Sequence, residues 1–170
     1  PDDFVLVCDG PLNPELDAVI AAKQQEMGNT LNVVRLAKNG GLGNALNEGI
    51  KHCKNELVAR MDSDDISHYD RCEKQLAVFN TRPKVSICSG IVEEFTTSPE
   101  IVDARRVPPE TNAEIVEFAK ERTPFNHPCV MYKKSAVEAA GSYQDFYLLE
   151  DYYLWLRMLS VTALTVTPDS

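Results

Sequence analysis

Short apolar runs that alternate with stretches of helical periodicity constrain the fold of this chain more than any other feature. Runs at residues 4–8, 33–36, 57–61 and 85–91 have the length and composition of buried strands. Between two of them, the apolar residues of segment 42–53 recur every three or four positions, which is the spacing of one helix face. Alternating strands and helices are typical of βαβ units. We therefore predict an α/β fold with a mostly parallel sheet flanked by helices.

Capping and turn residues predict the remaining elements. Asn13 followed by Pro14 indicates a helix start, and Ser67 with Asp70 indicates a second one. Further elements are expected as helices at 112–121, 135–140 and 151–159 and as a strand at 130–132. Segment 96–110 contains prolines and lacks periodicity, so we expect a loop or lid there. At 170 residues, these elements fit one domain.

The charge balance excludes several classes of partner. The sequence has 26 acidic and 17 basic residues and a net charge of −9. It therefore offers no basic surface for DNA, RNA or an anionic membrane, and we expect no nucleic-acid partner. An anionic substrate would need a local basic pocket or a divalent cation to bind such a chain. The five cysteines are scattered without a C-x-x-C pair, so we expect reduced core residues in the cytoplasm.

A dense acidic cluster, Asp62, Asp64 and Asp65, directly follows the predicted strand 57–61. In open α/β sheets, ligands bind beyond the carboxyl ends of the strands. Like charges about 4 Å apart repel by roughly 4 kcal/mol at an effective dielectric near 20, so a nearby positive charge is expected. Oxygen ligands suit Mg²⁺ or Mn²⁺. The alternative is a solvated turn whose aspartates cap the next helix.

Other motifs fit the sequence less well. An EF-hand loop starting at Asp62 is excluded, because Ile66 and Ser67 occupy positions that need an oxygen ligand and a glycine. A divalent-metal phosphatase of the D-x-D type stays open, although Arg60 interrupts the strand. The glycine-rich run 39–44 is compatible both with a phosphate cradle at a helix start and with a simple tight turn.

With these motifs the sequence resembles glycosyltransferase family 2, which comprises inverting enzymes of the GT-A fold. Residues 7–10 are similar to the family's VDDGS strand end, with Cys8 in place of an Asp and Pro11 in place of the Ser. Residues 39–49 resemble its N-x-G-x-x-x-A-R-N-x-G segment, with Leu46 where an Arg is usual. The departure at Leu46 removes any base or phosphate contact that the arginine would make.

Two acidic segments match the family more closely. Residues 60–65 (RMDSDD) resemble its metal-binding DxDD motif, and residues 150–158 (EDYYLWLRM) resemble its ED catalytic segment. Residues 126–131 (NHPCVM) are similar to a segment that precedes the acceptor side in related polysaccharide enzymes. No Q-x-x-R-W motif of processive synthases is visible, which favours transfer of single sugars. The family opens with a strand and a helix that this sequence lacks, so we expect residues 1–170 to be a GT-A catalytic domain without them.

The resemblance implies an activity and a cofactor. The protein would transfer a sugar from a nucleoside-diphosphate sugar, UDP-linked or other, to a hydroxyl of a glycan or lipid-linked acceptor in surface polysaccharide synthesis. The cofactor would be Mn²⁺ or Mg²⁺. A cytoplasmic location is expected, with any association with the inner face of the membrane coming from other segments. A domain that only binds a glycan or a partner is the alternative without catalysis.

The resemblance also implies roles for individual residues. The catalytic residues would be Asp151, as the base, and Glu150; the metal ligands Asp62, Asp64 and Asp65; and the substrate-binding residues Asp9, Asn39, Gly41, Asn47, Arg60, Asp62 and His127. A lone histidine such as His127 is also compatible with a hydrogen-bonded loop residue. The aromatic residues Tyr152, Tyr153 and Trp155 would stack on a sugar or, for at least two of them, fill the core.

Overall fold

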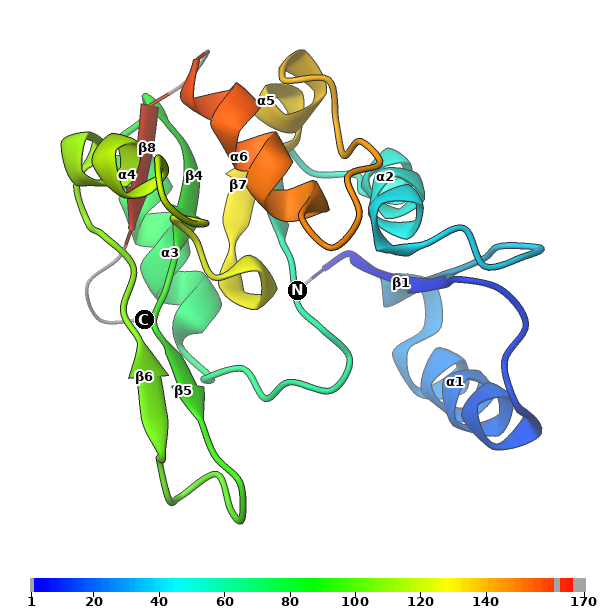
Figure 1. The fold of residues 1–170 in the computed structure, drawn as a ribbon. Helices are drawn as coiled ribbons and strands as arrows, with labels where there is room; N and C mark the ends of the chain where they lie inside the picture. Colours follow the sequence, from blue (N-terminus) through cyan, green and yellow to red (C-terminus); the bar gives the residue numbers. More distant parts are fainter. Residues whose placement is uncertain (1, 161–162, 167–170) are drawn as a thin grey trace.

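Two sheets form the framework of the protein (Figure 1). The structure is a computed structural model that describes residues 2–160 and 163–166. The smaller sheet pairs β1 (Phe4–Cys8) in parallel with β2 (Leu31–Arg35). The larger sheet has the order β3 (Leu57–Ala59), β7 (Met131–Lys133), β4 (Val85–Ser89), β8 (Ala163–Val166). The predicted strands are therefore confirmed, with ends that differ by one or two residues.

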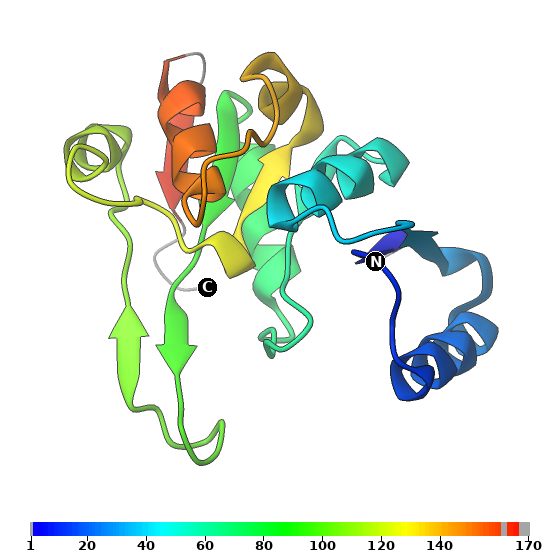
Figure 2. The same cartoon turned by 45° about the vertical axis from the view of Figure 1, so that its right-hand side comes forward.

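Helices alternate with these strands along the chain, which confirms the α/β class. They are α1 (Pro14–Met27), α2 (Leu42–His52), α3 (Arg71–Thr81), α4 (Asn112–Phe118), α5 (Lys134–Ala139) and α6 (Glu150–Leu159), with 3-10 turns η1 (Gly28–Thr30) and η2 (His127–Cys129). In Figures 1 and 2, α2, α5 and α6 lie together on one side of the larger sheet and α3 lies on the other. No helix in the described part of the chain is long and apolar enough to span a membrane.

The larger sheet is mixed rather than mostly parallel, which corrects the expectation from the sequence. Strand β8 runs parallel to β4, whereas β7 runs antiparallel to both β3 and β4. The reason is the place where β7 begins. Val130, between η2 and β7, accepts a hydrogen bond at 2.9 Å from the N-H of Arg60, which lies just past the end of β3. The chain thus enters β7 at the edge where β3 ends, and it must run back through the sheet in the opposite direction.

Segment 96–110 is only partly the loop that its prolines predict. It contains β6 (Ala104–Arg106), which forms an antiparallel hairpin with β5 (Val92–Glu94) that projects from the body of the protein (Figure 1). Cross-strand ion pairs join Arg105 to Glu93 and Arg106 to Glu94. Because these pairs are polar, the hairpin lacks the alternation of apolar and polar residues by which strands are recognised in a sequence.

One of the two predicted helix caps is confirmed and the other is wrong. The Asn13 side chain accepts a hydrogen bond from the Leu16 N-H at 2.8 Å, and Pro14 occupies the first turn of α1. Helix α3 begins at Arg71 after Asp70, whose side chain pairs with Lys74 instead of capping the helix. Ser67 lies in the preceding loop, where its hydroxyl donates to the backbone of His68.

The main core lies between the larger sheet and the helices α2, α5 and α6. Its largest fully buried side chains include Trp155, Tyr132, Phe125 and Ile87. Helix α2 also contacts the smaller sheet, since a Cβ added at Gly49 would lie only 3.0 Å from a Val7 methyl group. A larger residue at position 49 would require the Val7 side chain to shift by a few tenths of an ångström. Helix α2 therefore joins the two sheets.

Candidate active site

Asp9, at the end of β1, organises the glycine-rich turn before α2. Its carboxylate oxygens accept hydrogen bonds from the backbone N-H groups of Gly40 and Gly41, at 2.8 and 3.0 Å. The Asn39 side chain accepts a further bond from Gly41 at 3.1 Å. The structure thus brings together Asp9, Asn39 and Gly41, three of the residues predicted to bind substrate. A carboxylate already occupies the N-H groups that a phosphate cradle would need, which favours the tight-turn interpretation of this run.

The first turn of α2 lies against the segment that leads into α6. A Cβ added at Gly43 would lie 3.6 Å from Tyr143 Cβ and 3.7 Å from Glu150 Cβ, an ordinary contact distance. One turn later, the Asn47 amide donates to the Tyr143 carbonyl at 2.8 Å and accepts from the Tyr143 N-H at 2.9 Å. Asn47, predicted to bind substrate, therefore fixes the backbone of Tyr143. It acts on the site by positioning that segment beside Glu150.

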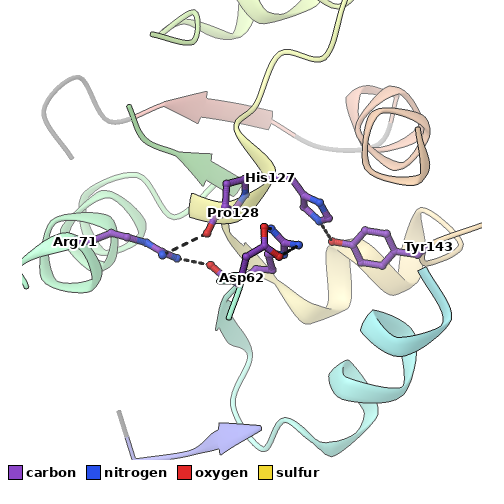
Figure 3. A network of polar contacts seen from close by, with 6 residues as sticks. Asp62, Arg71, His127, Pro128 and Tyr143 are labelled. Atoms are coloured by element: carbon purple, nitrogen blue, oxygen red, sulfur yellow. Dashed lines mark hydrogen bonds and ion pairs between the residues drawn. The ribbon is translucent and has the colours of Figure 1, made fainter. Parts of the chain in front are cut away.

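The acidic cluster contains its own positive charge. The Arg60 side chain is only 5% exposed and forms a two-pronged ion pair with both oxygens of Asp62 (Figure 3). Its backbone is held on both sides, because the Arg60 carbonyl also accepts from Arg71 Nη2 at 2.6 Å. Within the described chain, the buried Arg60 Nε has no hydrogen-bond partner. The sequence placed a metal beside Asp62, but the structure already supplies a guanidinium there.

Arg71 is a buried functional candidate that the sequence analysis missed. Its guanidinium donates to the carbonyls of Arg60, Pro128 and Val130 and to the side chain of Gln75. Gln75 in turn donates to the Cys129 carbonyl at 2.7 Å. These hydrogen bonds connect α3 to the end of β3 and to η2, and those of Arg71 to the Arg60 and Pro128 carbonyls are drawn in Figure 3. The Arg-x-x-x-Gln spacing on one helix face was the only indication in the sequence.

A cleft of about 720 Å³ opens over the acidic cluster. Asp62, Asp64 and Asp65 line one wall, and hairpin residues that include Glu93, Phe95 and Arg106 line another. Burial, followed by the charges of Asp62 and Asp64, raises the pKa of Asp65 above its ordinary value, against the opposing charges of Arg60 and Arg106. The residual negative charge therefore makes the cleft a favourable place for a cation. The other predicted site residues lie outside its lining.

The donor set fits a divalent metal that is bound together with a phosphorylated ligand. In residues 2–160 and 163–166, no three His, Cys, Asp or Glu side chains are arranged to enclose a metal ion. Mg²⁺ in nucleotide sites needs fewer protein ligands, because it is usually bound by one or two carboxylates together with the substrate phosphates. Asp64 and Asp65, both exposed, can supply those carboxylates, whereas the Asp62 oxygens already accept from Arg60.

His127 belongs to a neutral, partly buried polar pair. Its Nε2 lies 3.0 Å from the Tyr143 hydroxyl (Figure 3). Its ring packs edge-on against Trp155 at a centroid distance of 5.7 Å. Burial, and then the charge of Arg60, lowers the pKa of His127 to about 3. Burial also raises the pKa of Tyr143 well above its ordinary value. At neutral pH both groups are therefore uncharged, and one hydrogen bond joins them.

Asp151 lies in the first turn of α6, in a half-buried position. Burial raises its pKa, and the neighbouring charge of Glu150 adds to that effect, while hydrogen bonds from the Tyr152 and Asp151 backbone and the charge of Arg60 oppose it. A carboxylate with a raised pKa is a better proton acceptor than an ordinary aspartate. The charge of Arg60 thus reaches both this residue and Asp65, on the two sides of the site.

The aromatic residues of α6 mainly serve packing. Trp155 is fully buried, and the Tyr152 hydroxyl donates to the Ala119 carbonyl at 2.6 Å. The Tyr153 ring lies under the Arg157 guanidinium and beside Phe146. Core packing is therefore confirmed for Trp155, and Tyr152 is tied to the end of α4.

A family model described as "Glycosyl transferase family 2" matches residues 1–141. The chain belongs to this family. Among its relatives, an uncharacterized glycosyltransferase of Haemophilus influenzae is 43% identical, and the amylovoran biosynthesis glycosyltransferase AmsE of Erwinia amylovora is 41% identical. A third, the UDP-Gal:alpha-D-GlcNAc-diphosphoundecaprenol beta-1,3-galactosyltransferase of Escherichia coli, is 39% identical. Each alignment covers 94% of this chain and between 57% and 59% of the relative.

Two solved structures show the same fold. The mannosyltransferase PcManGT from Pyrobaculum calidifontis, in complex with GDP-Man and Mn2+, superposes with a TM-score of 0.70 at 15% identity, over 99% of this chain and 47% of that one. TarS 1-349 of S. aureus in complex with UDP gives a TM-score of 0.72 at 20% identity, over 100% of this chain and 50% of that one. The predicted GT-A fold is confirmed. Glu150 and Asp151 lie beyond the part matched by the family model.

Proposed function

We propose that the full-length protein is an inverting glycosyltransferase that moves a sugar from a nucleoside diphosphate to a hydroxyl of a glycan or lipid-linked acceptor. The observation that carries the proposal is the acidic cleft at the end of β3, together with the half-buried Asp151 of α6, in a chain of this family. AmsE is named for polysaccharide biosynthesis, and the Escherichia coli relative is named for a lipid-linked acceptor. Both names support a role in surface polysaccharide synthesis.

The donor would bind at the acidic cleft with Mn²⁺ or Mg²⁺. Asp64 and Asp65 would hold the metal, and the metal would neutralise the diphosphate and stabilise it as a leaving group. Asp62, oriented by Arg60, would contribute its remaining lone pairs to the metal or to a donor hydroxyl. Asp9, with the 39–41 turn it organises, would contact the base or the ribose. The Mn²⁺ and GDP-Man in the PcManGT structure support this assignment by fold similarity.

Asp151 would take the proton from the attacking acceptor hydroxyl. The raised pKa given by its burial suits this role, and the backbone N-H groups at the start of α6 keep its carboxylate oriented. Glu150, which lies beside the first turn of α2, would hold the acceptor or donor sugar near that base. Direct attack by the activated hydroxyl on the anomeric carbon would invert its configuration.

A thermal-shift experiment on the full-length protein tests the donor site. We expect nucleoside diphosphates and their sugars to stabilise the protein only with Mn²⁺ or Mg²⁺, by roughly 2.7 kcal/mol at a ligand concentration of 100 times the dissociation constant. Asp64→Ala should abolish the metal-dependent part of this stabilisation. Asp103→Ala, in the hairpin turn, is the control for the loss of one acidic side chain. Equal stabilisation in excess chelator would contradict the metal bridge.

A second part of the proposal concerns the sheet. In the described residues, β1 pairs with β2 alone and β3 pairs with β7 alone, so each sheet has an open edge. A strand placed between these edges would join the two sheets, in agreement with the strand and helix expected upstream in the family. Adding the upstream residues of the native gene should then raise donor affinity. An unchanged dissociation constant for the donor would contradict this extension.

A further inference from the structure

A row of exposed apolar side chains lies immediately before the proposed base. Phe146, Tyr147, Leu148 and Leu149, here called the apolar ridge, are 49%, 86%, 73% and 45% exposed. Single exposed apolar residues are common on protein surfaces, but four large ones in succession are not. Residues 144–149 are exposed throughout, and Glu150 follows directly as the first residue of α6. The ridge is therefore displayed at the acceptor side of the site.

The loop that carries the ridge is anchored on both sides. At its start, Asn47 fixes the Tyr143 backbone, and the Arg157 guanidinium donates to the carbonyls of Ala140 and Ser142. At its end, the Phe146 ring lies 5.1 Å from the Tyr153 ring, and the Leu149 N-H donates to the Phe146 carbonyl at 2.8 Å. Figure 1 shows the loop turning beside α2 before it enters α6. The ridge is thus held in a defined position.

The backbone of the ridge is strained at its most exposed part. Leu148 adopts a φ of +60°, in the left-handed region that a branched side chain rarely occupies. A glycine or asparagine would relieve this strain, yet the sequence places a leucine there. Strain of this kind persists where the surrounding structure enforces it, and it clusters at ligand-binding segments. At this point of the chain, Tyr147 and Leu148 are both largely exposed to solvent.

The charges around the ridge restrict what can dock on it. Asp145 precedes it and Glu150 and Asp151 follow it, so the residues adjacent to the ridge in the chain offer no positive charge to an anionic membrane or a phosphate group. A neutral sugar matches both the apolar ridge and the acidic residues beside it, because its apolar C-H face can stack on an aromatic ring while its hydroxyls donate to carboxylates. We propose that the apolar ridge is the acceptor subsite, where Tyr147 stacks against the terminal sugar ring and orients its hydroxyl toward Asp151. This inference rests on the proposed function.

Acceptor kinetics on the full-length enzyme test the subsite. Methyl and octyl pyranosides of glucose, galactose and N-acetylglucosamine serve as acceptor probes, with the nucleotide sugar that gives the fastest metal-dependent release of nucleoside diphosphate as donor. We expect Tyr147→Ala to raise the acceptor KM by about 3- to 10-fold, with donor KM and acceptor-independent donor hydrolysis unchanged. Tyr147→Phe should retain the wild-type KM, because the ring is kept. The matched control is Tyr69→Ala, which removes a tyrosine side chain outside the ridge that is 99% exposed.

The outcomes separate this inference from the proposed function. If wild-type enzyme neither hydrolyses a nucleotide sugar nor transfers it, the proposed function itself fails. If transfer occurs and Tyr147→Ala leaves acceptor KM unchanged, the subsite is overturned. A Tyr147→Ala effect seen with octyl but not with methyl pyranosides would also overturn it, since the ridge would then bind the alkyl chain. Thermal unfolding of each variant should match wild type, because the side chain is exposed.

Discussion

The proposed donor and acceptor sides of the site differ in how their groups are charged. On the donor side, three aspartates gather around an open cleft, and a buried guanidinium pairs with one of them. On the acceptor side, His127 and Tyr143 are buried enough to be neutral, and they share one hydrogen bond. The aspartates of the first arrangement have negative charge available for a cation, whereas the His127–Tyr143 pair carries no charge.

This difference follows from solvent access. Exposed carboxylates keep their charge because water screens it, and an added cation can bind them at little desolvation cost. The acceptor side packs against Trp155 in the core, where a charged imidazole would be costly. Arg60 lies between the two, since its charge acts on Asp65 and on His127. Variants on each side should therefore fail in different ways.

The largest expected effect is on the acceptor side of the chemistry. Asp151→Asn should lower the transfer rate by about 100-fold or more, because an amide cannot accept the proton of the acceptor hydroxyl. Asn caps a helix about as well as Asp, so thermal stability and donor binding should stay close to wild type. In wild type, the raised pKa of Asp151 predicts that the rate falls as acid protonates this base, at a pH above the ordinary range of an aspartate. A mutant rate within about threefold of wild type would move the base elsewhere, with Glu150 the next candidate.

A smaller effect should separate two aspartates within the donor side. Asp62→Ala leaves the buried Arg60 guanidinium without its carboxylate and should lower the free energy of unfolding by about 1.5 kcal/mol, moderated by the partial exposure of Asp62. Asp64→Ala removes an exposed side chain and should change it by no more than about 0.5 kcal/mol. Urea titration measures both. Equal destabilisation by the two variants would contradict the special pairing of Asp62.

The neutral state of His127 predicts a smaller, pH-dependent effect. Its pKa of about 3 in the folded protein lies below the ordinary value of 6.5, so between these values the unfolded chain binds a proton that the folded protein does not. This contribution to stability is complete above pH 6.5 and is lost as the pH falls toward 3. Between pH 8 and pH 6, wild type should lose about 0.8 kcal/mol more than His127→Gln. Exposed His52→Gln is the control and should follow wild type.

The smallest effect is expected in the hairpin that lines the donor cleft. Glu94→Gln breaks the ion pair with Arg106, but both side chains are at least 40% exposed. Pairs of this kind contribute about 0 to 1 kcal/mol, so we expect a change in unfolding free energy below about 0.5 kcal/mol. A loss above about 1.5 kcal/mol in urea titration would show that the hairpin depends on this pair.

The sequence by itself determined the α/β class, most strand and helix positions, and the acidic cluster after β3. These features depend on local periodicity, on capping residues such as Asn13, and on residues adjacent in the chain, so they can be read without knowing the fold. The resemblance to the family rests on the same short motifs. It named Asp62, Asp64, Asp65 and Asp151 but gave no partner for any of them.

The tertiary structure alone decided how those residues are paired. Arg71 and Gln75 reach the carbonyls of residues far away in the sequence, Asn47 contacts Tyr143 across 96 positions, and β7 enters the sheet antiparallel. The polar hairpin of β5 and β6 likewise forms through cross-strand ion pairs. Such contacts depend on which segments the fold brings together, and no local pattern encodes them. The physical reason is that burial and electrostatic fields are properties of the packed chain, and they set the charge of His127 and of Asp151.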